Sequence, residues 1–141
     1  MSDPTTLLAL AERCEQAARP DKELDQDITK LLVPRNAEPV YRSRYGWSFI
    51  VSGSGKGFEW LQNQPYTASL DAAVTLVPVE LPRNLRPGKW WWMLETWPDE
   101  CRASVHYENG DPAILEESAK AATPALALCA AALRARAASH D

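Results

Sequence analysis

The chain has 141 residues, of which 45% are hydrophobic and 24% are charged, ordinary values for a single globular domain. Its formal net charge of −4 argues against a general nucleic-acid binder, because such proteins are usually basic. The sequence contains no apolar run of about 18 residues, so we expect no transmembrane helix and one domain over residues 1–141.

Two helices are predicted in the first part of the chain. Asp3 and Pro4 form a typical helix start, since Asp caps free N–H groups and Pro is tolerated in the first turn. Apolar residues then recur at helical spacing until Pro20 ends the helix. We expect Asp21 to cap a second short helix over about 22–33.

The period changes to two over residues 41–51, where aromatic and polar side chains alternate. This pattern predicts a strand, bent at Gly46, with one aromatic face and one face that carries Arg42 and Arg44. Residues 58–62 are predicted as a second strand, which would complete a hairpin.

The second half of the chain begins with a predicted helix that runs to about Val77, with Thr67 as its N-cap. Residues 89–97 are strand-like and apolar on both faces, which is typical of a central strand covered on both sides. Pro98 starts a turn, and residues 101–107 form the return strand. If Trp97 pairs with Cys101, Glu95 faces Ala103 across the hairpin.

Residues 112–121 are predicted as a short helix, and residues 124–138, rich in Ala and Leu, as the last helix. The element order is then αα–β(β)–α–ββ–α. Strands apolar on both faces, combined with several helices, predict an α/β (α+β) fold: a three-layer α/β/α sandwich with a small, largely antiparallel sheet.

Three stretches carry a resemblance to a known family. They are Leu-Ala-Glu-Arg-Cys-Glu-Gln-Ala followed by Pro-Asp-Lys-Glu-Leu-Asp (10–25), Tyr-Thr-Ala-Ser-Leu-Asp-Ala-Ala (66–73) and Ala-Thr-Pro-Ala-Leu-Ala-Leu-Cys-Ala-Ala-Ala-Leu-Arg (122–134). In this order they resemble the small phage and prophage proteins of the phage ABA sandwich domain family. The resemblance implies an α/β/α sandwich and a phage origin, hence action in the cytoplasm of an infected bacterium. It transfers no catalytic residue.

Cysteine usage agrees with a cytoplasmic location. Cys14, Cys101 and Cys129 are far apart and odd in number, which fits reduced thiols rather than a disulfide framework. The chain starts Met1-Ser2-Asp3 and shows neither the basic nor the apolar segment of a signal peptide.

Common catalytic and metal-binding motifs are missing. The histidines, His106 and His140, have no zinc-site spacing, and no Gly-x-Ser-x-Gly motif is present. Residues 53–57 do not form a phosphate-binding P-loop, because Ile50 and Gly57 stand where that motif needs Gly and Ser or Thr. We therefore expect no cofactor, no metal and no catalytic site.

Two groups of residues are candidates for binding a ligand. At the third predicted helix, free N–H groups and the hydroxyls of Thr67 and Ser69, next to Tyr66, favour a phosphate. The alternative is structural, with Thr67 capping the helix and Tyr66 packing into the core.

The second group combines aromatic and basic side chains. Trp47 and Trp91 would stack a purine base or form a subunit interface. Arg42 and Arg44 would bind phosphate through their planar guanidinium groups, the alternative being solvated surface charge.

The aromatic and arginine residues and the missing catalytic motifs favour a non-enzymatic binding protein. The resemblance to phage proteins, several of which capture nucleotide signals of bacterial defence, implies that it sequesters a nucleotide immune signal, first an ADP-ribose derivative, as a homo-oligomer without nucleic acid or membrane. One alternative is a phage assembly or adaptor protein that binds a protein partner. Another is a nucleotide-cleaving enzyme that uses side chains of the 89–108 hairpin, namely His106, Glu95, Glu108 and Asp99.

Overall fold

The computed structural model describes residues 3–32, 37–43, 46–51, 59–62, 65–78, 86–110 and 115–139. These residues form four helices: α1 (Pro4–Gln16), α2 (Lys22–Leu32), α3 (Leu70–Val74) and α4 (Pro124–Ala138). They also form six strands: β1 (Ala37–Ser43), β2 (Gly46–Val51), β3 (Glu59–Gln62), β4 (Lys89–Thr96), β5 (Cys101–Glu108) and β6 (Leu115–Ala121).

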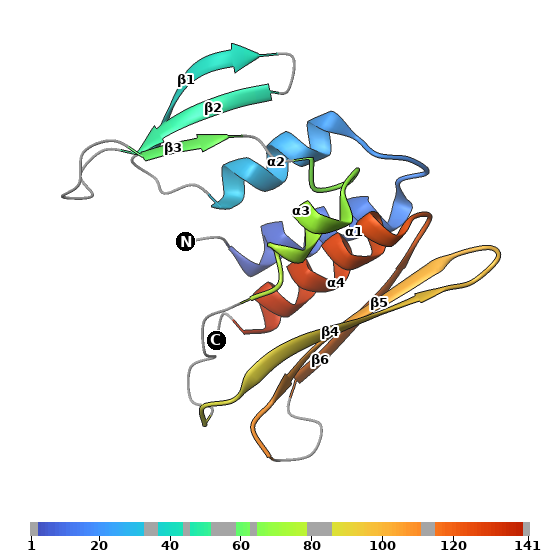
Figure 1. The fold of residues 1–141 in the computed structure, drawn as a ribbon. Coiled ribbons are helices and arrows are strands. Elements are labelled where there is room, and N and C mark those ends of the chain that lie inside the picture. Colours follow the sequence, from blue (N-terminus) through green and yellow to red (C-terminus); the bar gives the residue numbers. More distant parts are fainter. Residues whose placement is uncertain are drawn as a thin grey trace.

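The strands form two antiparallel sheets, β1–β2–β3 and β4–β5–β6, each with its strands in chain order. Figure 1 shows the four helices on the same side of the β4–β5–β6 sheet, with α4 directly against it. The predicted α+β class and the antiparallel pairing are confirmed. Because the described helices cover one face of this sheet, its organisation into three layers stays a prediction.

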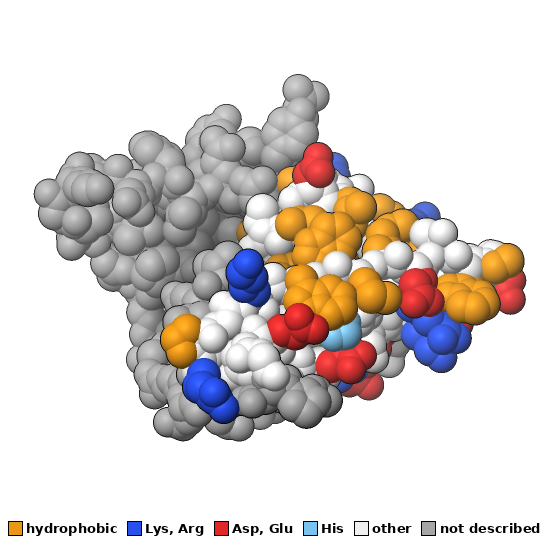
Figure 2. Space-filling model, turned by 60° about the horizontal axis from the view of Figure 1, so that its bottom comes forward, with side chains coloured by type: hydrophobic (Ala, Val, Ile, Leu, Met, Phe, Trp, Pro, Cys, Tyr) orange, Lys and Arg blue, Asp and Glu red, His pale blue; other side chains and the backbone are white. Residues whose placement is uncertain are grey.

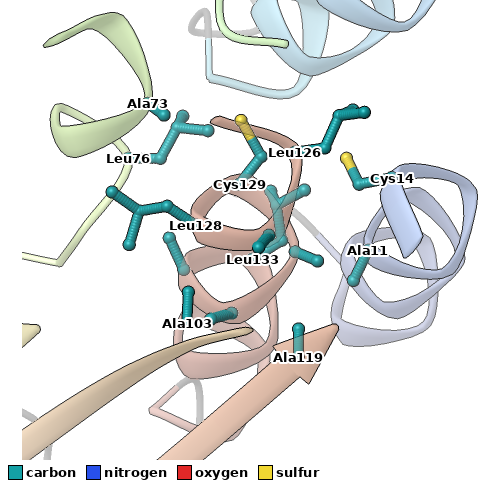
Figure 3. Close-up of a cluster of buried hydrophobic side chains, with 14 of the residues drawn as sticks. Ala11, Cys14, Ala73, Leu76, Ala103, Ala119, Leu126, Leu128, Cys129 and Leu133 are labelled. Carbon is teal, nitrogen blue, oxygen red and sulfur yellow. The ribbon is translucent and has the colours of Figure 1, made fainter. Parts of the chain in front are cut away.

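Helix α4 is the centre of the hydrophobic core. Thr123 begins the helix, since its hydroxyl accepts a hydrogen bond from the N–H of Leu126 at 3.2 Å. Apart from Arg134 and Arg136 near its end, its side chains are apolar on all sides, as expected for a helix surrounded by protein. Figure 3 shows Leu126, Leu128, Cys129 and Leu133 of α4 among side chains from α1, the α3 segment and both β5 and β6.

Two strand predictions are wrong in detail. Residues 41–51 are not one bent strand, because β1 ends at Ser43 and β2 starts at Gly46 and runs back antiparallel to it. Residues 89–97 are not a central strand either. β4 lies at the edge of its sheet, and among the described strands it pairs only with β5. The predicted strand over 58–62 is confirmed as β3.

Two helix predictions are also corrected. Residues 112–121 were expected to be helical, but residues 115–121 form β6, whose pairing with β5 outweighs the helix propensity of its Ala, Glu and Lys residues. The third helix is α3, only five residues long, and its N-cap is Ser69 rather than Thr67. The Ser69 hydroxyl accepts from the N–H of Ala72 at 3.3 Å.

Candidate functional site

The segment before α3, predicted to bind an anion, makes its polar contacts within the chain. Thr67 is fully buried, and its hydroxyl accepts from the N–H of Asp21 at 2.9 Å and donates to the carbonyl of Asp21 at 3.2 Å. Tyr66 lies in the core, where its carbonyl accepts from the Cys129 thiol at 3.1 Å. Ser69 caps α3. These residues therefore have structural roles here, and their binding role stays a prediction.

The other predicted residues are not gathered around them. Arg42 of β1 and Trp47 of β2 are register partners in the β1–β2–β3 sheet, and their side chains lie outside what the structure describes. Arg44 lies outside the described residues. Trp91 belongs to β4, in the other sheet. The predicted residues whose place is described thus lie in three parts of the chain: the segment before α3, the β1–β2–β3 sheet and the β4–β5–β6 sheet. Of these residues, Trp91 lies beside a groove that the structure describes.

The site around Trp91 lies on one face of the β4–β5–β6 sheet. This face points away from the helices. Alternate side chains of β5, from Cys101 to Tyr107, are buried toward α4, so the residues between them point outward. The strand register assigns their neighbours to the same side. We call this surface the open face, formed by Trp91, Met93, Glu95, Arg102, Ser104, His106, Glu116, Ser118 and Lys120.

An aromatic stack stands at one end of the open face. The indole of Trp91 lies flat on the imidazole of His106, with ring centroids 3.8 Å apart and planes inclined by 5°. The Nε2 atom of His106 is 2.8 Å from the hydroxyl of Ser104, with donor and acceptor set by the imidazole tautomer. The buried indole Nε1 of Trp91 has no acceptor among the described residues, an uncommon state for a buried donor.

Charged groups stand at the other end. Arg102 forms an ion pair with Glu100 at 3.0 Å, and its guanidinium lies 5.2 Å from the ring centroid of Trp97. Trp97 in turn donates from Nε1 to the carboxylate of Glu95 at 3.2 Å. On the neighbouring strand, Lys120 is exposed and forms no ion pair within the described ranges. Lys120 thus offers a cationic group to a ligand.

Between these ends lies an open groove of about 490 Å³. The open-face residues except Trp91 line it, together with Glu15, Ala103 and Ala119. His106 is one of the lining residues, and Trp91 covers one face of its ring. Figure 2 shows this side of the molecule, where hydrophobic side chains gather beside acidic and basic ones.

Most of the groove was missed from the sequence. The helix predicted over residues 112–121 contains three of the groove residues, Glu116, Ser118 and Lys120. The prediction therefore did not place these residues on the sheet. The hairpin register expected for the enzyme alternative is wrong by one residue, since Glu95 pairs with Arg102 and not with Ala103. His106 therefore pairs with Trp91 of β4 and with Glu116 of β6. Glu95 lies further along β4, opposite Arg102, so it is not a cross-strand neighbour of His106.

The described residues contain no group of three or more His, Cys, Asp or Glu side chains placed to hold a metal ion. None of the described helices has the length and apolar character needed to cross a membrane. No family model, no curated protein and no solved structure matches this chain. The similarity to the phage ABA sandwich family thus stays an interpretation of the three sequence motifs.

Proposed function

We propose that the open face binds a small anionic ligand of the nucleotide class and holds it without cleavage. The observation that supports this most is His106, which lines the groove and whose ring stacks on Trp91. Stacking of one base on an aromatic side chain contributes about 1–3 kcal/mol to the free energy of binding. A planar ring would therefore lie against His106, with Ser104 and Ser118 beside it as hydroxyl donors.

The charged end of the groove would take the phosphate. His106 and Arg102 are four residues apart on β5, which is roughly 13 Å along a strand. This spacing suits a ligand with separate base and phosphate groups better than a free base. Lys120 would supply the main positive charge, because the charge of Arg102 is already balanced by Glu100. The negative charge of Glu15, which also lines the groove, is balanced by Arg134.

The biological role we propose is sequestration of a nucleotide immune signal in the cytoplasm of an infected bacterium. This setting rests on the motif resemblance, and an ADP-ribose derivative is the first ligand to test. Binding without turnover would remove the signal by mass action. An adaptor role, in which the same face holds a protein partner, is favoured instead if no nucleotide binds.

Isothermal titration with ADP-ribose and with cyclic dinucleotides tests the proposal. We expect His106→Ala to weaken binding about tenfold, within the range for one stacked base. Lys120→Ala should weaken binding and reduce its salt dependence. Glu108→Gln is the matched control, because Glu108 is an exposed neighbour on β5 that does not line the groove. Binding that is absent, or unaffected by His106→Ala, would contradict the proposal.

One observation favours hydrolysis as a second candidate. The Ser104 hydroxyl lies within hydrogen-bonding reach of His106 Nε2, as a nucleophile lies beside a general base, and Glu116 is the cross-strand neighbour of His106. Chromatography of the ligand after incubation separates the two candidates. Intact ligand supports sequestration, whereas cleavage that Ser104→Ala abolishes, with binding retained, establishes the enzyme.

A further inference from the structure

The described residues that line the groove include three carboxylates, and two of these already have partners. Glu15 pairs with Arg134, and Glu95 accepts a hydrogen bond from the indole N–H of Trp97 at 3.2 Å. Glu116 is exposed and forms neither a hydrogen bond nor an ion pair with the residues that the structure describes. Its carboxylate is therefore available to a ligand in the groove.

Glu116 stands beside the ring on which the base would stack. It is the direct cross-strand partner of His106, and the Cβ atoms of such partners lie about 4.5–5.5 Å apart on the same face of a sheet. Trp91, which covers one face of the His106 ring, belongs to the strand on the other side of β5. A base stacked on the uncovered face of that ring would thus lie over β6, with its edge within reach of Glu116.

A carboxylate selects among bases, because it accepts hydrogen bonds and donates none. Guanine presents two neighbouring donors on its Watson–Crick edge, N1–H and the 2-amino group, and these match the two oxygens of one carboxylate. Adenine presents one donor there, the 6-amino group, next to the acceptor N1. Adenine would therefore gain one hydrogen bond and place the lone pair of N1 against a carboxylate oxygen.

The hydration of Glu116 increases this difference. The exposed carboxylate is hydrated in the free protein, and a base bound beside it displaces part of that water. Hydrogen bonds to an ionised acceptor are roughly twice as strong as those between neutral groups. Two of them offset the lost hydration, whereas one hydrogen bond combined with a repulsion does not.

We propose that the groove prefers guanine nucleotides over adenine nucleotides, and that Glu116 determines this preference. The inference rests on the proposed function, from which it takes the nucleotide class and the stacking on His106. The N1–H and the 2-amino group of the base donate to Glu116, and the phosphates extend toward Lys120. These two charged residues lie four positions apart on the same face of β6, roughly 13 Å along the strand. An ADP-ribose derivative would then bind more weakly than the corresponding guanine compound.

Isothermal titration with GDP, IDP and ADP tests the preference, because these nucleotides share the ribose and the diphosphate and differ only in the base. GDP offers both donors. IDP keeps N1–H but lacks the 2-amino group, and ADP offers one donor beside an acceptor. A bidentate contact discriminates between bases by about ten- to a hundredfold, so we expect GDP to bind at least about tenfold more tightly than ADP, with IDP between them.

The variant Glu116→Gln tests the residue itself. A Gln amide both donates and accepts, which matches the donor and acceptor of adenine better than the two donors of guanine. We expect this variant to lose the preference for GDP and to bind ADP at least as tightly as the native chain does. Glu117→Gln is the matched control, because the next side chain of β6 points to the helix side and does not line the groove. It should keep the native preference. Thermal unfolding verifies that both variants fold.

The outcomes separate this inference from the proposed function. Equal binding of GDP and ADP, both weakened by His106→Ala, would overturn the guanine preference and leave the nucleotide site in place. A preference for GDP that survives Glu116→Gln would overturn the role of Glu116. If GDP, ADP, ADP-ribose and the cyclic dinucleotides all fail to bind, the proposed function and this inference fail together.

Discussion

Thr67 and Asp25 are 42 residues apart in the chain, yet the main-chain N–H of Thr67 donates to Oδ1 of Asp25 at 2.7 Å. Both residues are buried, and the Thr67 hydroxyl also bonds to the main chain of Asp21. This cluster fixes the segment before α3 to the start of α2. The residue that the sequence suggested as a ligand contact is thus a structural link between two elements.

We expect Asp25→Ala to lower the free energy of unfolding by about 1–3 kcal/mol, because it leaves the buried Thr67 N–H without its acceptor. Asp25→Asn keeps an oxygen at the same place and should cost less. Urea unfolding of the two variants measures the difference. Equal losses would mean that the hydrogen bond does not account for the effect.

The same carboxyl makes stability depend on pH. Burial raises the pKa of Asp25 above its ordinary value of 3.8, although hydrogen bonds from Thr67 lower it. As pH rises past 3.8, the unfolded state releases its proton first, so the contribution of Asp25 to stability falls until the raised pKa is passed. Asp25→Asn does not titrate and should therefore gain stability relative to the native chain across this interval. Unfolding both proteins over a pH series checks it, and a constant difference would contradict the raised pKa.

Gly88 is required where the chain enters β4. A Cβ added at Gly88 would lie 2.0 Å from the main-chain carbonyl oxygen of Glu108. We expect Gly88→Ala to cost roughly 3 kcal/mol, the upper part of the range for overpacking, since main-chain atoms must move. Gly110→Ala is the comparison. A Cβ there meets nothing within 4 Å, and only its φ of +97° opposes the change, at about 1 kcal/mol. A smaller loss for Gly88→Ala would contradict the close approach.

The central position of α4 predicts a large effect of truncation there. Leu133 is fully buried, and Leu133→Ala should lower the free energy of unfolding by about 2–5 kcal/mol through lost burial and a residual cavity. Leu8→Ala removes the same atoms from a residue of α1 that is 42% exposed, and it should cost under 1 kcal/mol. Denaturant titration compares the two, and equal losses would show that α4 is not the centre of the core.

The sequence predicted the elements whose signals are local. α1 and α2 have a 3.6-residue apolar period, α2 and α4 have the N-caps Asp21 and Thr123, and Pro98 marks the β4–β5 turn, although the predicted Asp3 side-chain cap of α1 does not form. β6 could not be recognised in this way. Leu-Glu-Glu-Ser-Ala-Lys-Ala favours a helix by composition, and only the ladder with β5 makes it a strand.

Most of the groove depended on long-range register. A one-residue error in pairing β4 with β5 changes every cross-strand neighbour, so the stack of Trp91 on His106 was not foreseen although both residues had been singled out. Trp92 shows the same limit. A strand apolar on both faces is typical of the centre of a sheet, whereas β4 pairs with one described strand, and its Trp92 and Met93 side chains are exposed.

The place of α4 in the chain has a consequence for synthesis. Helix α1 and the three strands of the β4–β5–β6 sheet leave the ribosome before the helix that lies between them. Until residues 124–138 have emerged, Ala11, Cys14, Ala103 and Ala119 have no α4 surface to pack against. The nascent chain therefore exposes these apolar side chains to solvent until α4 has been synthesised.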